Sequence, residues 1–163
     1  MFHAHSRRLT RRHALALGAA LWFASPAVFA APPANTLKTG LFGGRTDTAI
    51  LGYDPVAYFT LGKPVKGRDE LAFDHLGAKW KFSSQAHLDL FKANPQKYTP
   101  QYGGYCAYGV SQDNLVSIEP DKFKVIDDKL YLNYDADVQA KWLKDPAGYI
   151  RQADAKFQSL LKK

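Results

Sequence analysis

The feature that most constrains the fold is the segment Tyr98–Val110, which holds four tyrosines, three glycines and the only cysteine of the chain. Tyrosine rings bury large apolar areas, while each phenol keeps a polar end. The adjacent glycines Gly103 and Gly104 weaken a helix interior and let the backbone turn at positive φ. The segment is therefore predicted to be a loop or an irregular strand that surrounds Cys106 with tyrosines.

Two interpretations of this segment stay open. Free cysteine often behaves as a small buried apolar residue, so the segment can be a plug that closes one end of the core. The alternative is a functional site, in which Cys106 does chemistry or the rings line a pocket for a small ligand or a partner loop. The candidate residues for such a pocket are all aromatic: Tyr53, Trp80, Tyr102, Tyr105 and Tyr108.

The first 30 residues predict an export signal that is removed from the mature protein. They combine a basic start, an apolar run over Ala14–Phe23 and a small-x-small end, so cleavage is expected between Ala30 and Ala31. The run is too short to span a membrane. Residues 10–15 resemble the twin-arginine motif, with Ala14 in place of the usual aromatic residue, and Sec export remains the alternative. The sequence thus predicts a periplasmic protein.

The rest of the chain predicts one domain without a nucleic-acid-binding charge balance. Residues 31–45 are rich in proline and alanine at their start and predict a flexible lead, and residues 46–163 predict a single domain. Residues 1–30 carry four arginines and no acid, so the mature part has 18 basic residues (22 minus 4) against 15 acidic ones. This small excess is scattered along the chain, which argues against a nucleic-acid partner.

Alternating apolar residues predict two β-hairpins, and helical spacing predicts the helices between and after them. We find no internal repeat, and we expect an α+β fold: a small antiparallel sheet of β-hairpins packed with a central short helix and two C-terminal helices. The expected turns, strands and helices are hairpins over 71–82 and 123–134, a short strand at Leu115–Ile118, a turn at 119–121, and helices over 84–93, 135–144 and 146–161.

The helix over 84–93 directs one histidine toward the core. His87, Leu90 and Phe91 lie at positions i, i+3 and i+4, so they share a face that we expect to be buried. An inward histidine needs partners for its ring nitrogens. These partners are a carbonyl or a hydroxyl if His87 is structural. The other option is that His87 ligates a metal or pairs with the thiolate of Cys106.

Asp54 is the third polar residue that we single out. It precedes Pro55, a pair that is typical of a helix N-cap and its first helical residue, with Gly62 expected to end the helix. We therefore interpret Asp54 first as a cap and only second as an additional metal ligand. The mature chain has one other histidine, His75, which we expect to be exposed next to its turn.

Together these pieces resemble the YHS domain family, in its exported bacterial branch. The similarity covers nearly all of the mature chain. The residues that carry it are Gly52–Phe59, Trp80–Ser84, Phe91–Tyr98, Gln101–Cys106 and Lys129–Tyr134. The resemblance implies a small α+β metal-binding domain, related to a cysteine-rich metallochaperone-like fold.

The chain departs from the family at the expected thiolate ligands. Ala57 and Ser83 stand where relatives carry cysteine, while His87 occupies the last ligand position, so only His87 transfers as a ligand. Cys106 belongs to this branch, and one imidazole plus one thiolate suits copper or zinc.

Four functions stay open on the sequence alone. The first is a metal-binding or metal-handling domain that uses His87 and Cys106, with Asp54 as a third candidate ligand. The second is a metal-free module that binds a small ligand or a partner protein through the tyrosine-rich segment. A thiol enzyme is the third, although the sequence offers no third catalytic residue, so a binding role is favoured over catalysis. The fourth is a structural domain that has lost its ligands.

Overall fold

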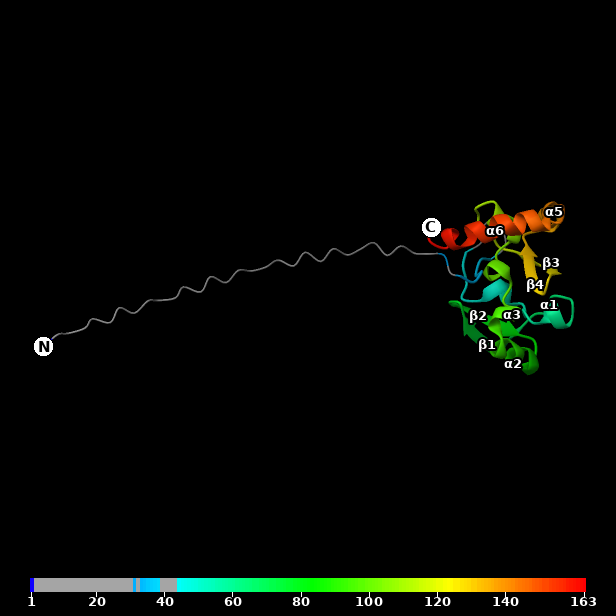
Figure 1. The fold of residues 1–163 in the computed structure, drawn as a ribbon. Helices are drawn as coiled ribbons and strands as arrows, with labels where there is room; N and C mark the ends of the chain where they lie inside the picture. The colour runs from blue at the N-terminus through cyan, green and yellow to red at the C-terminus, as the bar shows by residue number, and fades with distance from the viewer. Residues whose placement is uncertain (2–30, 32, 39–43) are drawn as a thin grey trace.

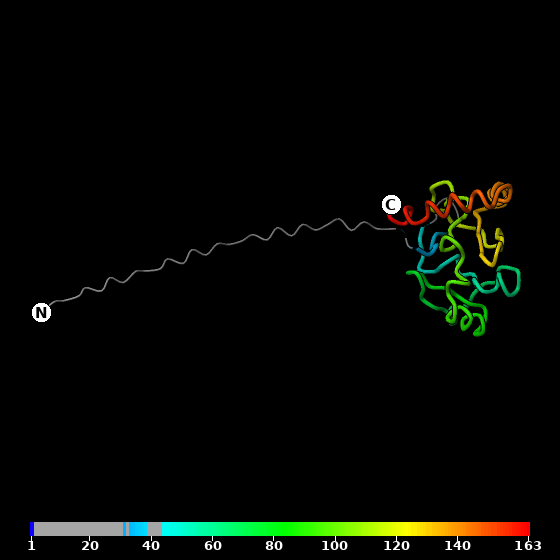
Figure 2. Tube along the Cα trace, in the orientation of Figure 1, coloured from blue at the N-terminus to red at the C-terminus, as the bar shows by residue number. Residues whose placement is uncertain are grey.

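The structure, a computed structural model, describes residues 1, 31, 33–38 and 44–163 (Figures 1 and 2). The predicted export signal, including Ala30 at the cleavage site, lies outside the described residues. Within the described part of the chain, every helix is too short or too polar to cross a membrane. The other described residues form one folded body (Figure 1).

The fold is α+β, as the sequence predicts. Two β-hairpins each form a separate two-stranded antiparallel sheet, and each is followed by two helices (Figure 1). The first set of elements is β1 (Arg68–His75), β2 (Ala78–Phe82), α2 (Gln85–Ala93) and α3 (Pro95–Tyr98). The second set is β3 (Glu119–Ile126), β4 (Lys129–Asn133), α5 (Ala136–Trp142) and α6 (Pro146–Leu160).

The two sets are copies of one unit, which corrects our expectation that the chain has no internal repeat. Both strands of the second hairpin begin and end 51 residues after their counterparts (119 minus 68). The register agrees at every pair, including the irregularity near the start of the longer strand, which follows Arg68 in β1 and Glu119 in β3. Both units then place a proline at the first residue of their last helix, Pro95 in α3 and Pro146 in α6. Few side chains are shared, so the sequence pattern hid the repeat.

The repeat also includes the segments that precede the hairpins. Two 3-10 turns, η1 (Ala49–Gly52) and η2 (Gln101–Gly104), each contain successive residues at positive φ. Two short helices follow, α1 (Ala57–Thr60) and α4 (Ala107–Ser111). Here the offset is 52 residues, because Ile50 and Tyr102 open the left-handed stretch in the two copies. This alignment makes Asp54 and Cys106 equivalent positions.

Each copy contributes its own aromatic packing. Around the first hairpin, Phe91 of α2 packs against Trp80 and Phe82 of β2, and all three side chains are fully buried. The alternation along β2 thus places Trp80 and Phe82 on one buried face. In the second copy, Tyr131 of β4 packs against Trp142 of α5. Each hairpin is therefore covered by the helix that follows it.

Several local predictions were wrong. The tyrosine-rich segment is not a loop or a strand: it contains η2 and α4, and Cys106 is the residue that caps α4. Residues 115–118 are not a strand, and residues 119–121 belong to β3 rather than to a turn. Leu90 is 41% exposed, because Leu88 instead joins Phe91 on the buried face of α2.

Residues 34–36 are packed, although they belong to the stretch over 31–45 that we predicted to be flexible. Ala34, Asn35 and Thr36 are buried, and the backbone N–H of Asn35 donates to the carbonyl of Gly103 at 2.9 Å. Gly103 allows this close approach, because a Cβ there would lie 1.7 Å from the carbonyl oxygen of Pro33. Residues 33–38 are thus part of the domain, and they cover the second copy of the unit.

Candidate functional site

The strongest polar cluster surrounds Asp54, whose side chain is fully buried. Its Oδ1 accepts hydrogen bonds from the backbone N–H of Val56 at 2.9 Å and of Ala57 at 3.3 Å, as an N-cap carboxylate does. Asp54 thus caps the turn that leads into α1, as predicted in kind, but the helix begins at Ala57 with Val56 as its N-cap residue, and not at Pro55. A carboxylate placed at these N–H groups satisfies donors that have no partner inside the helix.

The other oxygen of Asp54 joins α1 to the second strand and to α2. Its Oδ2 accepts the backbone N–H of Ser83 at 2.8 Å and the Ser83 hydroxyl at 2.6 Å. The same oxygen lies 2.6 Å from Nδ1 of His87. A buried carboxylate is costly unless it is paired and hydrogen-bonded, and these contacts meet that requirement. Asp54 therefore ties together three segments that are distant in sequence.

His87 is held by this carboxylate at one ring nitrogen and faces Thr60 with the other. The side chain is only 12% exposed, so it points inward as the helical spacing predicts. Because a carboxylate only accepts hydrogen bonds, Nδ1 carries the hydrogen that lies between His87 and Asp54. In the neutral ring Nε2 then keeps its lone pair. This nitrogen lies 3.1 Å from Oγ1 of Thr60.

Thr60 does not fill the lone pair of Nε2 when its hydroxyl bonds to the backbone. Its Oγ1 also lies 3.1 Å from the carbonyl oxygen of Val56, and a hydroxyl has a single hydrogen to donate. When that hydrogen goes to Val56, Nε2 is available to bind a proton or a metal ion. The arrangement of Thr60, His87 and Asp54 therefore presents one imidazole nitrogen in a fixed direction.

Cys106 occupies the position equivalent to Asp54, and its backbone contacts repeat those of Asp54. Its Sγ accepts the backbone N–H of Gly109, three residues on, at 3.3 Å, as Asp54 accepts that of Ala57. The backbone of Tyr134 also bonds to the sulfur, and Tyr134 is the counterpart of Ser83. The same cradle of N–H groups thus holds a carboxylate in one copy and a thiol in the other.

Burial keeps the cysteine protonated. Cys106 is 1% exposed, and desolvation raises the pKa of its thiol, while the N–H donors of Gly109 and Tyr134 lower it less. The thiol hydrogen points to Oδ1 of Asn133 at 3.9 Å, a weak contact. A protonated, buried thiol is neither a good nucleophile nor a good metal ligand.

The structure does not bring His87 and Cys106 together. The side-chain hydrogen bonds and ion pairs between described residues link His87 to Asp54, Ser83, Ser84 and Thr60, and none links it to Cys106. The repeat gives the reason, since the counterpart of His87 beside Cys106 is Val138 of α5. Over residues 31, 33–38 and 44–163, no three His, Cys, Asp or Glu side chains gather as a metal site.

The aromatic pocket candidates lie mostly in the core. Trp80 and Tyr105 are fully buried, and Tyr102 is 7% exposed with its hydroxyl bonded to Asp154 at 2.9 Å. Tyr108 packs edge-on against Tyr149 of α6, and Tyr53 lies beneath the ammonium group of Lys66. Their placement fits the plug interpretation better than a ring-lined ligand pocket.

The sequence reasoning missed two members of the polar cluster and misplaced the second histidine. Thr60 gave no signal in the sequence, because its role depends on its distance from α2. Ser83 was considered only as the replacement of a cysteine. His75 is not fully exposed: it packs against Trp80 and Phe91, and burial lowers the pKa of its ring. His75 therefore serves as an internal comparison for His87.

Comparisons with known proteins found no relative of this chain. No protein-family model, no curated protein and no solved structure matches the chain.

Proposed function

We propose that the protein handles a copper or zinc ion through Nε2 of His87. The observation that carries this proposal is the 2.6 Å contact between Nδ1 of His87 and the buried carboxylate of Asp54. Histidines that ligate metals almost always donate their other N–H to a carboxylate, a carbonyl or a water, which fixes the ring and makes the ligating nitrogen more basic. Asp54 is thus proposed to orient the ligand rather than to bind the metal itself.

A site with a single imidazole ligand suits transient binding and transfer of a metal ion better than its storage. A closed structural zinc site uses four ligands, and we assign only one here. The second ligand expected from the sequence, Cys106, is buried, protonated and bonded within the other copy of the unit. We therefore propose that Cys106 is structural and that further ligands come from solvent or from the molecule that delivers or receives the ion.

The proposed place of action is the periplasm, and it rests on the sequence of residues 1–30. The resemblance to the YHS family supports the same proposal, because His87 occupies a ligand position of that family. Copper and zinc both accept imidazole nitrogen, so the donor type suits either ion.

Metal titration of the mature protein tests this function. The mature chain has two histidines, so His75→Ala is a matched control for His87→Ala. We expect wild type and His75→Ala to bind Zn(II) or Cu(I) with equal affinity, and His87→Ala to bind at least tenfold more weakly. Cys106→Ser is expected to bind like wild type. Equal affinity in His87→Ala, or binding lost only in Cys106→Ser, would contradict the proposal.

A module that binds a partner protein is the second candidate, and one specific observation favours it. A cavity of about 510 Å³ opens beside η1, with lysine and arginine side chains in its wall. None of the residues that line this cavity belongs to the cluster around His87.

A further inference from the structure

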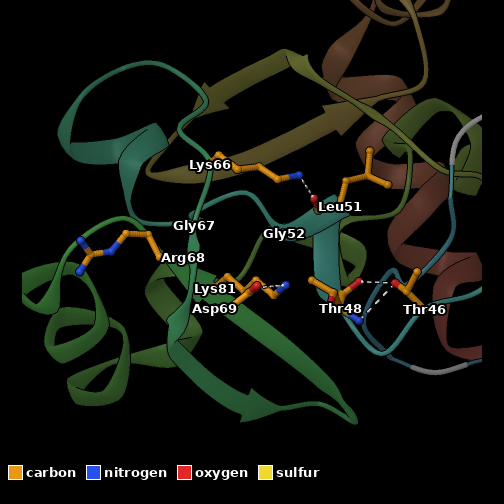
Figure 3. Close-up of a pocket in the computed structure, with 9 residues that line it drawn as sticks. All are labelled: Thr46, Thr48, Leu51, Gly52, Lys66, Gly67, Arg68, Asp69 and Lys81. Atoms are coloured by element: carbon orange, nitrogen blue, oxygen red, sulfur yellow. Dashed lines mark hydrogen bonds and ion pairs between the residues drawn. The ribbon is translucent and has the colours of Figure 1, made fainter.

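A cationic groove lies on the first copy of the unit, at a surface that no segment equivalent to residues 33–38 covers among the described residues. The cavity beside η1 is lined by Thr46 and Thr48 before η1, by Leu51 and Gly52 of η1, and by the residues around the start of β1 and the end of β2 (Figure 3). Gly67 brings these two strands together, since a Cβ on it would lie 2.5 Å from the backbone of Lys81. The close approach places the side chains of Lys66 and Lys81 on the same groove.

The positive charge of the groove is only partly neutralised. Lys81 pairs with Asp69, whose side chain is 87% exposed. Lys66 donates to the carbonyl oxygen of Leu51 at 2.6 Å and lies over the ring of Tyr53 at 4.6 Å. Neither of these partners carries a charge, and no described carboxylate forms an ion pair with Lys66. Arg68 also lines the groove, but its guanidinium pairs with Glu70 at 3.1 Å, so the two lysines carry the charge argument.

The equivalent surface of the second copy is covered by the chain itself. Leu51, Gly52 and Lys66 correspond to Gly103, Gly104 and Ser117, which all bond to the extended segment 33–38. Asn35 donates its backbone N–H to the carbonyl of Gly103 and its side-chain amide to that of Gly104, both at 2.9 Å. The hydroxyl of Ser117 donates to the carbonyl of Leu37 at 3.0 Å. In this unit, an extended segment therefore docks on this surface.

The side chains that differ between the two copies determine which kind of segment can dock on the first copy. Lys66 stands in place of Ser117, and Lys81 stands in place of Leu132, which is fully buried. Leu51 has a side chain where Gly103 admits the carbonyl of Pro33, so a segment must run farther out than residues 33–38 do. Carboxylate side chains of such a segment can still reach the two ammonium groups.

We propose that this groove binds an extended, acidic peptide segment of a partner protein. Alternate side chains of an extended segment point to the same side, so acidic residues two positions apart face Lys66 and Lys81 together. On the first copy, attraction between these acidic side chains and the two lysines takes the place of the hydrogen bonds that residues 33–38 make to the second copy. This inference is independent of the ion that His87 is proposed to handle, because none of the groove residues belongs to the cluster around Asp54.

The test is peptide binding followed by amide NMR on the mature protein. The probe is an acetylated and amidated six-residue peptide with glutamate at alternate positions and threonine or alanine between them. The control peptide has glutamine at each glutamate position. We expect the acidic peptide to shift the amide signals of Gly52 and Gly67, and we expect the glutamine peptide to bind at least tenfold more weakly.

Charge-reversed variants localise the binding. We expect Lys66→Glu and Lys81→Glu to weaken binding of the acidic peptide at least tenfold each, while the matched control Lys162→Glu, at the exposed C-terminus, leaves it unchanged. The double variant is expected to bind a peptide with lysine at the alternate positions. This gain of binding shows that the variant is folded.

Three outcomes would overturn the proposal. Equal binding of the glutamate and glutamine peptides would remove the role of charge. Binding of free succinate as tight as that of the peptide would make the groove a site for a small anion. Binding of neither peptide by the wild type would remove the site. A His87→Ala variant should bind the acidic peptide normally, so failure of the metal proposal is distinguishable.

Discussion

The two copies of the repeated unit use one backbone cradle for two different side chains. In the first copy, the cradle holds the carboxylate of Asp54, and the neighbouring position on α2 is His87. In the second copy, the cradle holds the thiol of Cys106, and the corresponding position on α5 is Val138. Both side chains cap a short helix, so the cradle itself is a structural feature of the unit.

The difference lies in what each side chain requires of its surroundings. A buried carboxylate needs several donors and a cationic or polar partner, whereas a buried thiol is nearly apolar. The carboxylate of Asp54 therefore needs the hydrogen-bond donors of Ser83 and His87. The thiol of Cys106 can instead lie beside the apolar side chain of Val138. The histidine is explained by the carboxylate, and its Nε2, which faces Oγ1 of Thr60 at 3.1 Å, is the nitrogen that we propose for metal binding.

The largest expected effect is loss of stability on removal of the carboxylate. Asp54→Ala leaves the N–H groups of Val56 and Ala57, together with Ser83 and His87, without their shared acceptor. We expect a loss of about 3 kcal/mol in the free energy of unfolding. The equivalent change, Cys106→Ala, should cost about 1 kcal/mol, because it removes only weak sulfur bonds and a small volume.

Urea unfolding of both variants measures this contrast. Equal losses in Asp54→Ala and Cys106→Ala would contradict the idea that the first copy depends on its polar cluster. His87→Val in the Asp54→Ala background should cost less than in wild type, because the two side chains interact directly.

A second prediction concerns the segment that covers only the second copy. Gly103→Ala places a Cβ at positive φ and against the carbonyl of Pro33, so we expect a loss of about 2 kcal/mol. Gly77→Ala is the matched control, because Gly77 also has positive φ (+72°) but has open space around it. Its expected cost is about 1 kcal/mol.

Hydrogen exchange of the backbone amide of Asn35 distinguishes displacement of residues 33–38 by the new Cβ from backbone strain at the substituted glycine alone. We expect faster exchange of this amide in Gly103→Ala and not in Gly77→Ala. Equal stability and equal exchange in the two variants would show that residues 33–38 do not depend on the glycine.

Alkaline pH should destabilise the fold gradually, mainly through the second copy. Burial raises the pKa of Cys106 and of Tyr102, Tyr105 and Tyr131, and the hydrogen bond to Asp154 raises that of Tyr102 further. A group whose pKa is raised on folding stabilises the protein below its unfolded pKa, and this contribution is lost as pH rises.

The effect should therefore begin near the ordinary thiol pKa of 9.0 and grow above the ordinary tyrosine pKa of 10.0. Tyr58 of the first copy titrates in the same direction. Unfolding free energies measured from pH 7 to pH 11 check the trend, and alkylation of Cys106 by iodoacetamide should be slow at pH 7. Rapid alkylation of the folded protein at pH 7 would contradict the buried, protonated thiol.

Local periodicity and turn residues predicted much of the fold. The hairpins around residues 76–78 and 127–129, the stop at Asn94-Pro95 and the C-terminal helix are visible in the sequence, because alternation, proline and helical spacing act over a few residues. The repeat was not visible, because it is conserved in backbone register while most side chains differ. Trp80 and Tyr131, for example, are equivalent but not identical.

The candidate site was predicted only in part. Helical spacing directed His87 inward, and Asp54 was recognised as a cap. The contact between them joins residues 33 positions apart, and no local pattern encodes such a distance. Pairing His87 with Cys106 instead assumed that the tyrosine-rich segment folds toward α2, whereas the repeat places Cys106 beside α5 and β4.

The most direct test of this account is the tautomer of His87, measured by long-range ¹⁵N–¹H NMR on the mature protein at pH 8. The account predicts that in the neutral ring the hydrogen lies on Nδ1 and not on Nε2, with His75 as the second signal for comparison. Addition of Zn(II) should then shift the Nε2 resonance of His87 and leave His75 unchanged. A hydrogen on Nε2 of neutral His87, or a zinc-induced shift confined to His75, would contradict the central role of the pair formed by Asp54 and His87.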